Sequence, residues 1–225
     1  MQETSNIVKL RHLLAERFPL LRQGVSVARP SEIVETGVAA LDELLGGGLP
    51  RGEFTELIAA GSGTGSAQVI HALLRRVAAD GRFLGLVDGA DSFDVTAVDS
   101  LVLARLLWVR CGRPEEAMKA ADILLRDRNF PVLVLDLKLS SVAQLRRIPA
   151  STWYRFARLL EQNQTTVLVV TPCQLVSGAA CRVRAESGLG IDHLNGSPEQ
   201  IPERLRFALL RSSAASEVDR VSRAG

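Results

Sequence analysis

Short apolar runs that alternate with segments of helical periodicity predict an α/β fold. The runs at residues 132–136 and 166–171 are almost wholly apolar, as strands covered on both faces of a sheet are. Strands separated by amphipathic helices form a mostly parallel central sheet flanked by helices. Residues 181–185 and 205–211 alternate with no helical pattern between them, which predicts closing antiparallel strands at the C-terminal end.

The same patterns place each element along the chain. Strands are expected at residues 54–59, 83–88, 107–111, 132–136 and 166–171. Helices are expected at residues 7–21, 36–45, 67–79, 92–106, 114–126 and 151–162. Pro19 ends the first helix, Pro114 occupies the first turn of the fifth, and Ser151 or Thr152 is expected to cap the last.

These patterns divide the chain into three predicted regions. Residues 1–30 are predicted to form an N-terminal amphipathic helix and linker, residues 31–211 the core domain, and residues 212–225 a disordered tail. The apolar face of the N-terminal helix is a candidate docking element for a partner, although the same face would equally pack on the chain's own core. Its candidate contact residues are Ile7, Leu10, Leu14 and Phe18.

Composition excludes several classes of protein. With 225 residues, 47% hydrophobic and 23% charged, the chain can build a large core and is not disordered throughout. A net charge of +2 argues against nucleic-acid binding by bulk electrostatics. The apolar runs are too short to span a membrane, and the charged N-terminus is not a secretory signal, so we expect a cytoplasmic protein. The cysteines and histidines lack metal-ligand spacing, so no metal site is predicted.

The turn after the first core strand is the expected place for a phosphate-binding loop. A P-loop has the pattern G-x-x-x-x-G-K-[ST], in which lysine neutralises the outer phosphates and the hydroxyl ligates magnesium. Of these, only Gly65 is in place: Ala60 replaces the first glycine, Ser66 the lysine and Ala67 the hydroxyl. The degenerate loop comprises Ala60, Gly61, Ser62, Gly63, Thr64, Gly65, Ser66 and Ala67.

Three interpretations of this loop are open. A Rossmann dinucleotide fingerprint would need glycine at position 66, where the chain has serine. Weak ATP or phosphate binding through backbone amides and the helix dipole is a second interpretation. The favoured interpretation is a structural turn that hydrolyses nothing, with no cofactor and no catalytic residue.

Residues 36–53, with the sequence TGVAALDELLGGGLPRGE, resemble the segment that leads into the P-loop of RecA-like recombinases. The resemblance covers about residues 33–211. It continues at residues 86–91, at Glu116-Ala117, and at residues 132–136, which are similar to the Walker B strand of RecA. It implies a RecA-like P-loop NTPase fold, with Asp136 at the place of the Walker B aspartate.

Departures from the RecA pattern imply a lost activity. Ala90 falls where RecA has the glutamate that activates water, and Thr171-Pro172-Cys173 replaces its glutamine sensor. Residues 174–180 form a short turn where RecA has a long DNA-binding loop, so filament formation on single strands is not expected. Arg146, Arg147, Arg182 and Arg184, expected as scattered surface arginines, remain candidates for DNA contact.

A degenerate RecA-like domain with a basic N-terminal helix is similar to the ImuA family, bacterial accessories of SOS-induced mutagenic translesion synthesis. That resemblance implies a pseudo-ATPase that docks on RecA, on the ImuB-type inactive polymerase homologue, or on the error-prone replicative-type polymerase. Two rival readings are a divergent ATP-dependent recombinase or ATPase that uses the glycine loop and Asp136, and a SulA-like cell-division inhibitor that binds FtsZ.

Overall fold

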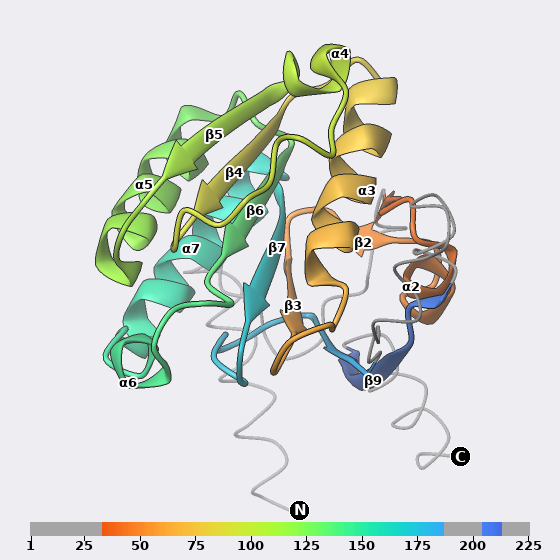
Figure 1. Cartoon of the computed structure of the whole chain (residues 1–225). Coiled ribbons are helices and arrows are strands. Elements are labelled where there is room, and N and C mark those ends of the chain that lie inside the picture. The colour runs from red at the N-terminus through yellow and green to blue at the C-terminus, as the bar shows by residue number, and fades with distance from the viewer. Residues whose placement is uncertain (1–32, 187–203, 213–225) are drawn as a thin grey trace, which may run out of the picture. The chain divides into compact units, whose positions relative to one another are not determined.

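A seven-stranded, mostly parallel sheet forms the centre of the protein in the computed structural model (Figure 1). The structure describes residues 33–186 and 204–212, all within the larger of two units of the chain, Glu32–Gly225. The strands of this sheet are β3 (Phe54–Ile58), β4 (Leu84–Asp88), β5 (Leu106–Arg110), β6 (Val132–Asp136), β7 (Thr166–Thr171), β8 (Cys181–Ala185) and β9 (Phe207–Ser212).

The order of the strands is β5-β4-β6-β7-β3-β8-β9. Every neighbouring pair from β5 to β8 is parallel, and only β9 runs antiparallel to its neighbour, β8. The predicted α/β class is confirmed, including the antiparallel pairing at the C-terminal end. β8 itself lies parallel to β3, so within the described residues the antiparallel part of the sheet is the single strand β9.

Helices cover both faces of the sheet. They are α2 (Ala39–Leu44), α3 (Ser66–Ala79), α4 (Ser100–Leu103), α5 (Pro114–Asp127), α6 (Val142–Leu145) and α7 (Ala150–Asn163). In Figure 1, α3 lies on one face while α5 and α7 lie together on the other. Two short antiparallel strands, β1 (Ile33–Val34) and β2 (Leu49–Pro50), form a separate sheet that the sequence patterns did not predict.

Two apolar clusters hold these layers together. One packs α2 and α3 against the sheet and includes Leu41 and Leu73; the other packs α5 and α7 against the opposite face and includes Leu125 and Trp153. All four side chains are at most 1% exposed. Burial of this kind contributes about 25 cal/mol per Å² of apolar surface, so the aliphatic side chains supply most of the stability.

The helix predicted at residues 92–106 is wrong over most of its length, because only α4 forms there. Asp88 accepts hydrogen bonds from the backbone N–H groups of Ser92 and Phe93, at 2.8 Å each. Asp94 accepts further hydrogen bonds from the backbone N–H and the hydroxyl of Thr96. Such local side-chain bonds offer the backbone an alternative to helical hydrogen bonding.

Other boundaries differ by smaller amounts. The cap residue of α7 is Pro149, in an extended conformation with no side-chain cap, so the prediction of a Ser151 or Thr152 cap is wrong. The proline ring fixes φ of Pro149 near the value seen at this cap position, and Ser151 and Thr152 both lie inside the helix. Ser212 belongs to β9 instead of the predicted tail. The N-terminal helix and the remainder of the tail fall outside the described residues.

Within the described residues, no helix is both long enough and apolar enough to cross a membrane.

Candidate functional site

The degenerate loop lies between the carboxyl end of β3 and the first residue of α3, where a P-loop would lie. Gly61, Gly63 and Gly65 have φ of 79°, 66° and 74°, in the left-handed region that L side chains rarely adopt. Gly65 is the cap residue of α3, so the three glycines curl the backbone into the helix N-terminus. The glycine spacing seen in the sequence therefore has a conformational cause.

Leu205 covers the end of this loop. A Cβ placed on Gly65 would lie 2.1 Å from Cδ2 of Leu205, and the Leu205 side chain is 0% exposed. Residues 60–63 remain exposed, whereas Thr64 and Ser66 are buried. The amino end of α3 is thus packed against a side chain that the sequence analysis did not assign to the site.

Lys138 also contacts the loop. Its ammonium Nζ donates a hydrogen bond to Oγ1 of Thr64, at 3.1 Å. Lys138 follows β6 by two residues, so the parallel sheet brings it to the same edge as the loop. The only sequence signal for this residue was a lysine directly beyond an apolar strand. The loop, which has serine at the expected lysine position, therefore contacts a lysine supplied by another strand.

Asp136, the residue predicted at the Walker B position, lies at the end of β6. Its carboxylate accepts a hydrogen bond from the backbone N–H of Lys138, at 3.0 Å. Burial raises the pKa of Asp136 to about 6, and the nearby Asp88 carboxylate adds to that rise, while the Lys138 hydrogen bond and charge oppose it. The dominant cause is desolvation, which penalises the charged form.

Asp88 lies opposite Asp136 in the register of β4 and β6, but its oxygens are already used. They accept hydrogen bonds from three backbone N–H groups, those of Ala90, Ser92 and Phe93, and from the Trp108 indole at 3.3 Å. Asp88 therefore anchors the segment that follows β4.

Ala90 carries no ionisable group at the place that the RecA resemblance assigns to a catalytic glutamate. Its neighbour Asp91 has a carboxylate, but both oxygens pair with the Arg110 guanidinium, at 2.5 and 2.7 Å. The Arg110 hydrogen bond lowers the pKa of Asp91. Across residues 33–186 and 204–212, no group of three His, Cys, Asp or Glu side chains is arranged to hold a metal ion.

The four arginines proposed for DNA contact do not share one environment. Arg146 and Arg147 are exposed at the end of α6, and Arg184 is exposed on β8. Arg182, expected on the surface, is instead buried, and its Nε donates a hydrogen bond to Oε2 of Glu56 at 2.5 Å. The surface expectation for Arg182 is wrong because Arg182 pairs with Glu56 and with the Val176 carbonyl of the turn after β7, whereas Arg184, on the same face of β8, stays exposed.

Glu56 is the centre of a network that the sequence analysis missed. Its Oε1 accepts hydrogen bonds from the backbone N–H groups of Leu175 and Val176, at 2.6 and 3.0 Å. Arg182 in turn donates to the Val176 carbonyl. The network ties β3 and β8 to the turn after β7, and a buried glutamate in an apolar strand was its only sequence signal. The docking residues Ile7, Leu10, Leu14 and Phe18 lie outside the described residues.

Comparison with known proteins gives a consistent picture of the fold. The chain is 32% identical over 120 residues to the RecA proteins of Mycolicibacterium vanbaalenii, Rhodococcus jostii and Mycobacterium marinum. In each case the match covers 52% of this chain and 34% of the RecA protein, so it spans about a third of the relative's length. No family model matches the chain. The RecA similarity and the mostly parallel sheet together support a RecA-like fold.

Proposed function

We propose that this chain is a non-catalytic RecA-like accessory protein of SOS-induced mutagenic translesion synthesis, similar to the ImuA family, that acts in the cytoplasm. It would work through contacts with RecA, with an ImuB-type polymerase homologue, or with an error-prone replicative-type polymerase. The observation that carries the proposal is that the chain's own side chains engage the degenerate loop: Lys138 bonds Thr64, and Leu205 covers Gly65.

The groups that phosphoryl transfer requires are replaced or already hydrogen-bonded at this site. A nucleotide triphosphate needs a cation at its outer phosphates, a magnesium ion held by a hydroxyl, and a group that orients the attacking water. Ser66 and Ala67 stand at the two P-loop positions, and the Asp88 carboxylate is engaged by backbone N–H groups. These features support a role that does not depend on ATP turnover.

ATP hydrolysis by the full chain tests the catalytic half of the proposal. We expect turnover at background with and without single-stranded DNA, and no difference between the parent and Asp136→Asn. Turnover that disappears in Asp136→Asn would favour the divergent ATPase instead. ATP binding at micromolar concentration, measured by calorimetry on the same samples, would point the same way.

Partner capture tests the interaction half. The purified chain is incubated in parallel with RecA, with RecA on single-stranded DNA, with the ImuB-type protein and with FtsZ. We expect capture of RecA or of the ImuB-type protein, weakened by the double substitution Leu10→Asp and Leu14→Asp. Tyr154→Ser, which alters an exposed side chain on α7, is the matched control. Capture of FtsZ alone would support the hypothesis of a SulA-like cell-division inhibitor.

A further inference from the structure

Leu205 fills the space beside Gly65, the last glycine of the degenerate loop. A Cβ on Gly65 would overlap Cδ2 of Leu205 and lie 3.4 Å from its Cδ1 and Cγ, whereas a Cβ on Gly61 would meet no atom of the described residues within 4 Å. Glycine lets a ligand approach the backbone closely, and in a P-loop that ligand is a phosphate held at the helix N-terminus. In this chain an apolar side chain makes the close approach instead.

The position of Leu205 is fixed by the sheet and by the core. The carbonyl of the next residue, Arg206, accepts a hydrogen bond from the N–H of Glu186 at 2.9 Å, directly after β8. The Leu205 side chain is 0% exposed and belongs to the apolar cluster that contains Leu41. Leu205 can therefore leave Gly65 only if its backbone separates from the end of β8 or if the cluster opens.

Thr64, the residue before Gly65, is held as well. It is 5% exposed, and its hydroxyl accepts the hydrogen bond from the Lys138 ammonium at 3.1 Å. The Lys138 backbone N–H in turn donates to the Asp136 carboxylate at 3.0 Å. The helix end of the loop is therefore tied to the end of β6, which hinders its movement away from Leu205.

The residues at this loop do not fit ATP with magnesium. Ser66 offers no cation for the outer phosphates, and Ala67 offers no hydroxyl for the metal. Phosphate groups are charged and lose their hydration at a high cost against an apolar surface, so Leu205 is a third obstacle. It differs from the first two because it lies in a distant segment of the chain and would remain after the loop residues were restored.

We propose that Leu205 is an internal plug, a side chain that excludes the phosphates of nucleoside diphosphates and triphosphates from the degenerate loop. Restoring the two missing P-loop residues would then not restore nucleotide binding while Leu205 is present. The inference rests on the proposed non-catalytic function and adds a physical cause for it. Nucleotide is excluded at two places in the sequence, the loop itself and the residue two positions before β9.

Calorimetric titration of the full chain with ATP and magnesium chloride tests the plug. The double variant Ser66→Lys with Ala67→Thr restores the P-loop residues, and a triple variant adds Leu205→Ala. We expect the parent to show no binding. The triple variant should bind ATP at least about tenfold more tightly than the double variant, because apolar atoms are removed from the place of the phosphates.

A matched control separates the plug from a general loosening of the core. Leu41→Ala, added to the same double variant, removes a buried leucine of the same cluster from α2. This control should bind ATP no more tightly than the double variant does. Circular dichroism shows whether each variant is folded. Leu205→Val removes less of the side chain, so it replaces Leu205→Ala if that variant is unfolded, and it should raise the affinity by a smaller factor.

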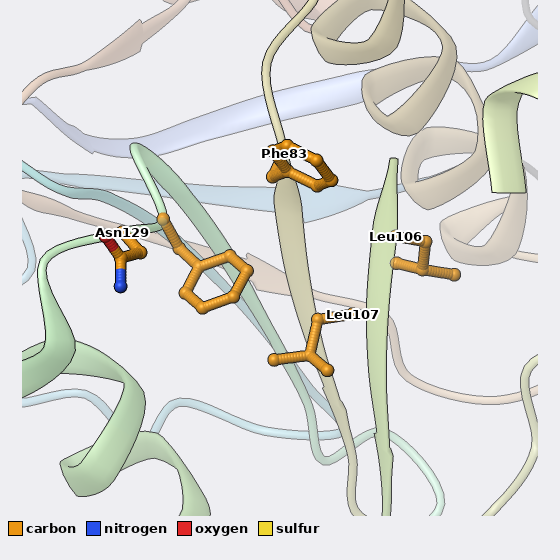
Figure 2. Close-up of a pocket in the computed structure, with 5 residues that line it drawn as sticks. Phe83, Leu106, Leu107 and Asn129 are labelled. Atoms are coloured by element: carbon orange, nitrogen blue, oxygen red, sulfur yellow. The ribbon is translucent and has the colours of Figure 1, made fainter. Parts of the chain in front are cut away.

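An apolar pocket of about 370 Å³ requires a control of its own, since an adenine ring is also apolar. Figure 2 shows its lining residues Phe83, just before β4, and Leu106 and Leu107, at the start of β5. These residues lie at the amino ends of parallel strands, whereas the loop follows the carboxyl end of β3. Leu107→Asp in the triple variant should therefore leave the affinity for ATP unchanged.

Equal affinity of the double and triple variants would overturn the plug and leave the proposed function standing. The plug is also overturned if the Leu41→Ala control binds like the triple variant, if a folded triple variant binds no ATP, or if Leu107→Asp abolishes binding. ATP binding by the parent would contradict both proposals, whereas a failed partner capture would contradict the proposed function alone.

Discussion

The Lys138 ammonium donates a hydrogen bond to the Thr64 hydroxyl at 3.1 Å, across 74 positions of sequence. The bond joins the end of β6 to the glycine loop that precedes α3, at the edge where parallel strands of the sheet end. On the helix side of the same loop, Leu205 packs against Gly65. The end of the loop at Thr64 and Gly65 is therefore held by contacts within the chain.

Gly65 and Leu205 should be energetically coupled. Leu205→Ala removes a fully buried side chain and should lower the free energy of unfolding by about 2 to 4 kcal/mol. Gly65→Ala should cost at least about 2 kcal/mol, because a Cβ meets Leu205 and the φ of 74° is strained for alanine. In the double variant the steric conflict is gone, so the two losses should sum to more than the measured loss. Urea unfolding of all four proteins measures the coupling, and strict additivity would contradict the contact.

Asp136→Asn should stabilise the protein at neutral and alkaline pH. The pKa of Asp136 is raised to about 6 from an ordinary value of 3.8, so the folded state binds the proton more tightly than the unfolded state does. Its contribution to stability is present below pH 3.8 and is lost as the pH rises through 6. Removing the charge should therefore raise the free energy of unfolding by about 1 to 3 kcal/mol at pH 8, with the gain vanishing near pH 4.

Urea unfolding of Asp136→Asn between pH 4 and 8 measures this difference. Glu43→Gln, at an exposed position of α2, is the control and should change the unfolding free energy by less than about 0.5 kcal/mol. A loss of stability in Asp136→Asn at pH 8 would mean that the charged carboxylate holds Lys138 more strongly than burial opposes it.

Arg182→Met should destabilise the protein by about 3 to 5 kcal/mol, because it leaves the buried Glu56 carboxylate without its cation. Glu56→Gln combined with Arg182→Met should recover part of this loss, since the side-chain oxygen can still accept from the N–H groups of Leu175 and Val176. Chemical denaturation measures both. If Arg182→Met unfolds at the parent's midpoint, the ion pair is not formed in solution.

DNA binding offers a separate readout for the arginines. A gel-shift series with Arg146→Ala, Arg147→Ala and Arg184→Ala should show any phosphate contact as a uniform loss across sequences with a reduced salt dependence. Arg182→Lys keeps the buried charge and should leave DNA binding unchanged. Selective loss of DNA binding in a stably folded Arg182→Lys variant would argue against the buried role.

Acid should destabilise the protein through His71. Burial, and secondarily the Arg75 charge, lower the pKa of this ring, which lies edge-on to Phe93 at 5.1 Å between centroids. The stability that depends on neutral His71 is present above pH 6.5 and is lost as the pH falls toward the lowered folded pKa. His71→Leu should flatten the decline of stability between pH 6.5 and 5 in thermal melts. An unchanged pH profile in that variant would assign the decline to other groups.

Local sequence patterns predicted most of the helices and strands but not the conformation of every segment between them. Residues 132–136 and 166–171 were predicted to the residue, since strands buried on both faces must be continuously apolar. Residues 92–106 were wrongly predicted as a helix because periodicity does not register the hydrogen bonds that Asp88 and Asp94 make to nearby backbone. The helical periodicity in this segment corresponds to a helix only at α4.

The candidate site, too, was predicted only in part. The sequence predicted where the loop lies, after the first core strand, and which glycines form it. A left-handed backbone favours glycine locally, so these glycines mark the turn. Lys138 and Leu205 were not, because their contacts with Thr64 and Gly65 join residues remote in the chain. Arg182 shows the same limit: Arg182 and Arg184 lie on the same face of β8, and only the contact with Glu56, 126 positions away, makes one buried and the other exposed.

By itself, the sequence determined the α/β class, the buried strands and the degenerate glycine loop, since each depends on periodicity or on the conformational limits of single residues. The tertiary structure alone decided that Lys138 meets the loop, that Glu56 and Arg182 pair in the interior, and that Phe83 and Leu107 line one pocket. These depend on which strands become neighbours, and that order is set by packing the whole chain around one sheet.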